Sequence, residues 1–250
     1  MHDGTLTGVK TLFKKEIRDF FNSPIAYVFI IIFLAVPNIF MFFFFGGIFK
    51  ENMASMRVYF SMLPFIYVIF IPGLAMGTWT KESNAGTMEL LLTYPVSDVS
   101  VLLGKFFSSL FVVIIALLST IFIPLLTSLL LGDFDWGQIF SQYLGAIFLS
   151  CACLSITFFI SSLTKELIIS FLISCAALLI LVVISLMPSI SVFPDWLIWL
   201  KPVLIWVSLS THFENFSKGV IDTRDIIYYA GVTGIFFYLN LRSLDSRKWG

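Results

Sequence analysis

Charged residues are scarce in this sequence. They make up 12% of its 250 residues, 15 basic and 15 acidic, whereas a soluble domain typically has about 25%. The net charge of zero argues against nucleic acid as a partner, because proteins that bind it carry a basic surface. In place of charge the chain is 59% hydrophobic, with 29 phenylalanines. This composition indicates an integral membrane protein and leaves no room for a separate soluble domain.

Side chains that bind metals or attack substrates are also rare. The cysteines Cys151, Cys153 and Cys175 all lie in apolar runs, where we expect them to act as small hydrophobic residues. No pair of His or Cys residues has the spacing of a metal site. His212 and Glu214 are interpreted as a solvated loop pair rather than a catalytic pair, because no nucleophile accompanies them. We therefore expect no enzyme activity, no metal and no cofactor in this chain.

The sequence also lacks a G-x-x-x-x-G-K-[ST] motif, so it has no phosphate-binding loop of its own. No acidic or basic residue lies in the core of its long apolar segments, where ion-coupled carriers place such groups. These two absences argue against an ion-driven carrier and against an intramembrane enzyme. If the protein does work, a partner chain must supply the energy.

Long apolar segments dominate what is present. A spanning helix needs about 20 such residues, and six segments qualify: 24–49, 58–79, 106–131, 138–163, 167–187 and 225–243. The first is too long for a signal peptide and is expected to stay in the membrane. The apolar run 196–209 is too short to span, so it predicts a re-entrant or interfacial hairpin before the last span, with a seventh span as the competing interpretation. The fold class is therefore an all-α integral membrane protein with six transmembrane helices.

The distribution of Lys and Arg predicts the orientation. Six spans put both termini on one side, which then holds ten basic residues against five on the other side. Because basic residues favour the cytoplasmic side, both termini and the segment Lys81–Lys105 are predicted to be cytoplasmic. The segments 132–137 and 188–224 then face outward.

The first 23 residues form a distinct region, ahead of a transmembrane domain over 24–250. Apolar residues recur at helical spacing from Val9 to Phe21, and the opposite face carries basic residues such as Lys14 and Arg18. This pattern predicts an amphipathic helix that lies along the cytoplasmic membrane surface.

The semi-polar segment Lys81–Lys105 separates the second and third spans. Ser83 or Asn84, with Thr87 as a further option, could cap a short helix that contains Met88–Leu92. Pro95 would end that helix, and Ser97 or Asp98 would cap the next one. The residues leave two interpretations open: an ordinary interfacial helix in lipid, or a docking helix for a soluble motor.

At these residues the chain resembles a known family. The pattern E-x-x-x-G-T-M-E-L-L-L-x-x-P-V-S-D-x-x-x-x-x-G-K over Glu82–Lys105 is similar to the signature loop of ABC-2 type transporter permeases. Further matches at Lys14–Tyr27, Ser161–Thr164 and His212–Tyr229 resemble the gliding-motility-associated permease subunit most closely. Together these matches extend over nearly the whole chain.

The resemblance implies a function and its partners. Such permeases sit in the bacterial inner membrane and pair with a second permease half, either the same chain or a paralogue. An ABC ATP-binding subunit, which holds ATP-Mg, docks on the cytoplasmic loop and drives export. An anchor or assembly role in a surface machine, without transport, remains the alternative. The docking residues carried over from the family are Glu82, Gly86, Thr87, Glu89, Leu90 and Pro95.

Overall fold

The computed structural model describes residues 2–39, 56–86, 97–125, 135–184 and 201–248, together with residues 186 and 199. These residues form helices and no strand, as the sequence predicts. The helices are α1 (His2–Phe21), α2 (Pro24–Ile39), α3 (Arg57–Ser61), α4 (Leu63–Ala75), α5 (Gly77–Asn84), α7 (Asp98–Ser119), α9 (Trp136–Leu163), α10 (Leu167–Val183), α11 (Lys201–Val207), α12 (Leu209–Ser217) and α13 (Thr223–Lys248).

Fewer segments than expected meet the length and apolarity of a spanning helix. Among the described residues three do so, Leu63–Asn84, Asp98–Leu125 and Trp136–Leu163, and a fourth is added if the bent pair α1–α2 counts as one span. Helix α10 has 17 residues and is about 25 Å long, slightly short of a hydrocarbon core of about 30 Å. Helix α13 is long enough but mixes Tyr, Gly and Asn into its apolar residues. The six-span architecture therefore stays a prediction.

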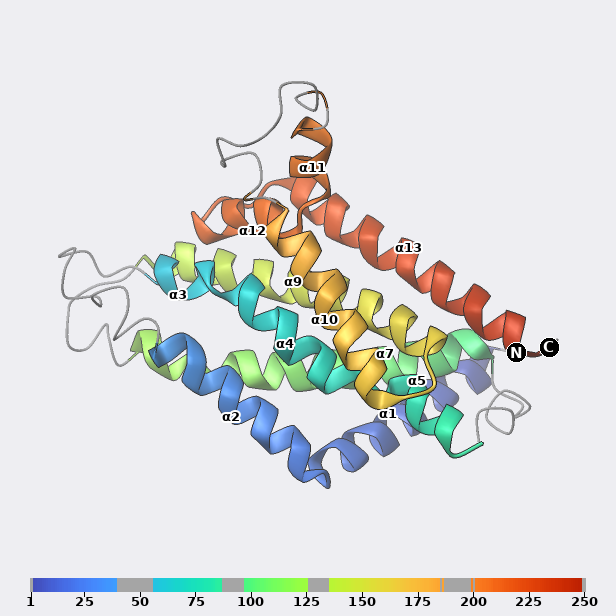
Figure 1. The fold of residues 1–250 in the computed structure, drawn as a ribbon. Helices are drawn as coiled ribbons and strands as arrows, with labels where there is room; N and C mark the ends of the chain where they lie inside the picture. Colours follow the sequence, from blue (N-terminus) through green and yellow to red (C-terminus); the bar gives the residue numbers. More distant parts are fainter. Residues whose placement is uncertain are drawn as a thin grey trace.

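Helix α9 lies at the centre of the bundle. It packs against α4, α5, α7, α10, α12 and α13, and Figure 1 shows it running through the middle of the molecule. Its buried face is rich in small residues, among them Gly145, Ala146, Ala152 and Ser155. Small residues let helices approach closely within a membrane, so the sequence of α9 explains its central position.

Side-chain caps fix where several helices begin. The Ser97 hydroxyl accepts a hydrogen bond from the backbone N–H of Ser100 and starts α7, which confirms the cap predicted there. Asp135 accepts from Gly137 and Gln138 in the same way and starts α9. Helix α7 thus begins at Asp98, eight residues before the expected third span.

The expected cap at Ser83 or Asn84 is wrong. Both residues lie in the last turn of α5, which ends at Asn84 rather than beginning there. Gly86 follows with a φ of 64°, a left-handed conformation that glycine adopts without strain and that commonly ends helices. The predicted turn at Gly86 is therefore present, but the second span continues into the polar residues Lys81 and Glu82 before the chain turns.

A break between α4 and α5 interrupts the second span. Pro72 lies within α4, and Met76 separates the two helices. The carbonyl of Met76 accepts hydrogen bonds from the hydroxyls of Thr80 (2.7 Å) and Ser161 (3.0 Å). The polar backbone at the break is thus paired inside the bundle, as a membrane requires.

The amino-terminal helix and the chain ends share one end of the bundle. Helices α1 and α2 meet at 74°, and α1 packs along α7. In Figure 1 both chain ends and the end of α5 lie on the right. This arrangement agrees with a shared side for the termini and the Lys81–Lys105 segment, and its assignment to the cytoplasm stays a prediction.

Two short helices, α11 and α12, precede α13. Helix α11 has seven residues and is about 10 Å long, which is too short for a seventh span. The hairpin predicted over 196–209 falls partly outside the described residues and stays a prediction.

Helices α12 and α9 approach each other closely at Gly145. A Cβ atom at this position would collide with Cβ and Cγ of Phe216, which is fully buried. We expect Gly145→Val to push α12 away from α9 and to cost about 3 kcal/mol of stability. Thermal unfolding in detergent measures this loss. Gly231→Val is the matched control because the space around Gly231 is open, and equal effects of the two variants would contradict the packing described here.

Candidate functional site

The two helices that flank the predicted docking loop are joined by an ion pair. Glu82 lies near the end of α5, and Lys105 lies two turns into α7. Their atoms Oε1 and Nζ are 2.6 Å apart. A charged hydrogen bond, a strong type of contact, therefore joins the two helices that precede and follow residues 87–96.

Lys105 is also held by a third helix. Its Nζ atom lies 2.9 Å from Oε1 of Glu16 on α1 and 5.5 Å from the ring centre of Trp79 on α5. A cation above an indole ring is favourable. We call Lys105, Glu16, Glu82 and Trp79 the Lys105 cluster. It connects the amphipathic helix α1 to both flanks of the loop.

Burial makes the Lys105 cluster important for stability. The Lys105 side chain is 3% exposed, while the side chains of Glu16 and Glu82 are 24% and 17% exposed. A lysine that deep is tolerated only when its charge is paired. Two carboxylates face one ammonium, so the cluster carries one net negative charge.

The Lys105 cluster is also bonded to the centre of the bundle. The backbone N–H of Trp79 donates to Ser161 on α9, and the same hydroxyl donates to Met76 at the α4–α5 break. Ser162, the next residue of α9, donates to Ser243 on α13. These hydrogen bonds join α5 and the α4–α5 junction to α9, and α9 to α13.

The structure describes only part of the predicted docking set. Glu82 has one carboxylate oxygen engaged by Lys105, and Gly86 forms the turn after α5. The other members, Thr87, Glu89, Leu90 and Pro95, lie outside the described residues. Docking of an ATPase on these six residues stays a prediction.

Sequence reasoning missed the role of Lys105. The residue was expected to mark the end of the loop, but it lies inside an apolar helix and is buried. One signal was available: a basic residue directly before an apolar run, matched by an acidic residue at the other base of the loop. Glu16 could not have been added to this pair, because only the packing of α1 on α7 brings it there.

A second polar cluster lies where α12 meets the first turns of α13. Nδ1 of His212 is 2.6 Å from Oδ1 of Asp225, and Asn215 donates to the second oxygen of Asp225 at 2.8 Å. The His212 ring stacks on Tyr228 with ring centres 3.8 Å apart. This cluster fixes α12 against α13.

The interpretation of His212 and Glu214 as a solvated loop pair is therefore wrong. His212 lies on α12, and its side chain is 13% exposed. Glu214 points elsewhere and pairs with Lys218 at 2.7 Å. Helical geometry separates the two side chains, because residues two positions apart lie on different faces.

The described part of the candidate site is a set of ion pairs and hydrogen bonds that join α1, α5, α7 and α9. No group of three His, Cys, Asp or Glu residues with the geometry of a metal site occurs in the described ranges. The family model described as "ABC-2 family transporter protein" matches residues 10–194, which include the whole Lys105 cluster. No curated protein matches the sequence.

Proposed function

Because the chain belongs to the ABC-2 family of transporter proteins, and is thus the permease component of an ABC transporter, we propose that it is driven through its Lys81–Lys105 segment. The partner in this proposal is a separate ABC ATP-binding subunit that holds ATP-Mg. The direction is export across a bacterial inner membrane. A second permease half, identical or paralogous, completes the path.

One observation supports coupling at this segment more than any other. The base of the loop is closed by the pair Glu82–Lys105, and the same lysine holds Glu16 of α1. A force applied to the loop would therefore move α1, α5 and α7 together instead of bending the loop alone. The Met76 break then lets α5 move relative to α4 while its hydrogen bond to Ser161 directs the motion to α9.

Within this proposal the six docking residues have different tasks. Glu89 and Leu90 contact the ATPase, as acceptor and apolar knob. Gly86, Thr87 and Pro95 shape the loop. Glu82 serves chiefly as a positioning residue, because Lys105 already holds one of its oxygens.

Apolar side chains on the outside of the bundle support a further protein or lipid partner. Helix α10 exposes Ile168, Leu172 and Ile180 at 72%, 59% and 62%. Exposed apolar surface of this kind is stable only against lipid or another membrane protein. The second permease half could cover part of it.

Reconstitution tests the function. Vesicles that contain this chain together with its P-loop ATPase are expected to hydrolyse ATP and to move a substrate, whereas either chain alone does neither. Vesicles that hydrolyse ATP but move no candidate substrate would favour the anchor role in a surface machine. Because His212–Tyr229 resembles the gliding-motility subunit, the source bacterium should also be tested for loss of gliding when this chain is deleted.

Labelling tests the proposed orientation. In a chain with its three cysteines replaced by serine, Lys81→Cys should react with a membrane-impermeant maleimide only from the cytoplasmic side. Ile221→Cys, which is exposed at the other end of α13, should react only from the outer side. Labelling of Lys81→Cys from outside would reverse the arrangement.

A further inference from the structure

A cavity of about 340 Å³ lies inside the bend between α1 and α2. We call it the elbow cavity. Residues of α1, α2, α4, α5, α7 and the start of α10 line it. Its volume falls in the range of small-molecule sites, about 300–1,000 Å³. The charged residues in its lining are Lys15, Glu16, Asp19, Lys81, Glu82 and Lys105.

The charges around the elbow cavity are balanced. The three ionised members of the Lys105 cluster leave one net negative charge, as described above. Lys15, Asp19 and Lys81 are exposed, and within the described ranges no ion pair joins them to another side chain. The cavity therefore presents the lysines Lys15 and Lys81 beside the carboxylate of Asp19. A ligand with one anionic and one cationic group would complement both.

Two glycines one turn apart shape this cavity. Lys81 folds back over Gly77, so that a Cβ atom there would lie 2.7 Å from Cε of Lys81. The Phe29 ring occupies the space over Gly73 that a Cβ atom would need. Gly77 thus gives room to a lysine that lines the cavity, and Gly73 lets α2 approach α4 closely.

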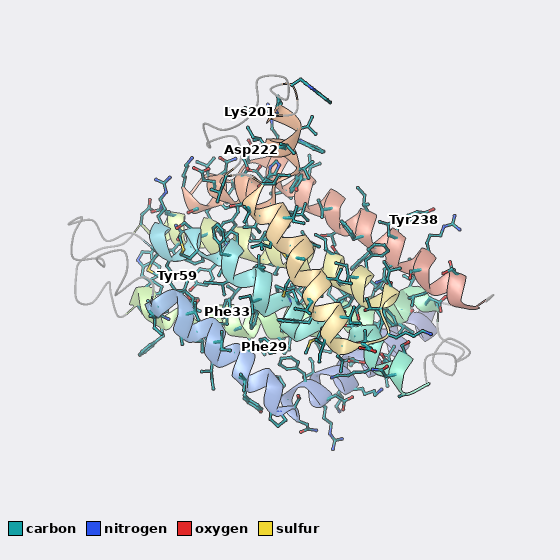
Figure 2. All side chains as sticks on the ribbon, viewed as in Figure 1. Phe29, Phe33, Tyr59, Lys201, Asp222 and Tyr238 are labelled. Carbon is teal, nitrogen blue, oxygen red and sulfur yellow. The ribbon has the colours of Figure 1, made fainter. Side chains whose placement is uncertain are left out.

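An apolar groove of about 330 Å³ shares one lining residue, Phe29, with the elbow cavity. It lies between α2 and α4, and its lining includes Ile32, Val36, Ile66 and Ile69. Phe29 lines both the cavity and the groove, and Figure 2 shows it on the side of α2 that faces α4. A charged cavity beside an apolar groove suits an amphiphile that has a headgroup and an acyl chain.

We propose that the elbow cavity and the groove bind one phospholipid with an ethanolamine headgroup. The phosphate lies between Lys15 and Lys81. The ammonium donates a hydrogen bond to Asp19, and one acyl chain lies along the groove. An ethanolamine headgroup fits better than an anionic one because the lining has as many carboxylates as lysines. It also fits better than choline, whose quaternary nitrogen has no N–H to donate.

Native mass spectrometry of the full chain tests this proposal. The protein is equilibrated in nanodiscs of phosphatidylethanolamine and phosphatidylglycerol and then released. The wild-type chain is expected to retain one phosphatidylethanolamine. Lys15→Glu and Lys81→Glu should each lower this retention about fivefold, the usual effect of one basic residue on lipid binding. Lys14→Glu is the matched control, because Lys14 is exposed on the same helix but does not line the cavity.

Two further variants test the binding of the lipid headgroup and of the acyl chain separately. Asp19→Lys should shift the retained lipid toward phosphatidylglycerol, because the lining then has an excess of positive charge. Val36→Trp fills the groove and should reduce retention, whereas Ile31→Trp on the exposed face of α2 should not.

Three results would overturn the proposal: wild-type preference for phosphatidylglycerol, equal losses in Lys14→Glu and Lys15→Glu, or no retained lipid. The first two indicate general attraction to a basic helix. The measurement requires no ATPase, so its failure leaves the proposed function untouched.

Discussion

Lys105→Met is expected to destabilise the protein by about 3 kcal/mol and to uncouple ATP hydrolysis from the spans. The variant removes a buried cation and leaves the carboxylates of Glu16 and Glu82 facing each other without it. Removing one partner of a buried ion pair typically costs about 3–5 kcal/mol, and the lower value applies because both carboxylates are partly exposed. Thermal unfolding in detergent measures stability, and ATPase activity with the partner chain measures coupling.

A compensated variant separates these two effects. Lys105→Met combined with Glu16→Gln and Glu82→Gln removes the whole charge set, which is often nearly neutral for stability. We expect this chain to regain most of its stability but not its coupling, because the contact between α1, α5 and α7 is no longer charged. Lys14→Met controls for the loss of a lysine in the same region, since Lys14 is exposed and does not line the elbow cavity. If Lys105→Met behaved like Lys14→Met, the role given to the Lys105 cluster would be wrong.

Leu90→Asp is expected to weaken the association with the ATPase about 30-fold. A central apolar side chain of a protein interface typically contributes about 2 kcal/mol or more to the binding free energy. A loss of about 2 kcal/mol corresponds to an affinity about 30-fold lower. An aspartate would also have to be buried without a partner. The affinity of the purified chain for the ATPase, measured in detergent or nanodiscs, tests the prediction, with ATP hydrolysis as the second readout.

A charge reversal and a remote control accompany Leu90→Asp. Glu89→Arg should have a similar effect if Glu89 accepts hydrogen bonds from the ATPase. Ile221→Asp adds the same charge at an exposed position at the far end of α13 and should leave the affinity unchanged. Wild-type affinity in both loop variants would remove the docking assignment from this segment.

Short-range sequence signals predicted several features of the fold. The helix start at Ser97 followed from its capping side chain. The turn at Gly86 followed from the conformational freedom of glycine. Each of these features depends on residues within a few positions of one another.

Features that depend on tertiary packing were not predictable. Burial of Lys105 depends on Glu16, which lies 89 positions away in the sequence. The pair His212–Asp225 requires α12 to fold back on α13, so the nearer Glu214 was considered instead. The end of α5 was misplaced because Ser83 and Asn84 suit either end of a helix by composition. Helix α9 is central because small residues pack well, and this pattern differs little from that of a lipid-facing span.

Photo-crosslinking from position 90 tests the central claim most directly. A photoreactive amino acid at Leu90 should crosslink to the P-loop ATPase in native membranes, and the same amino acid at Ile221 should not. This result would place the motor on the loop whose base the Lys105 cluster closes. Crosslinking to the ATPase from position 221, or only to lipid from position 90, would contradict it.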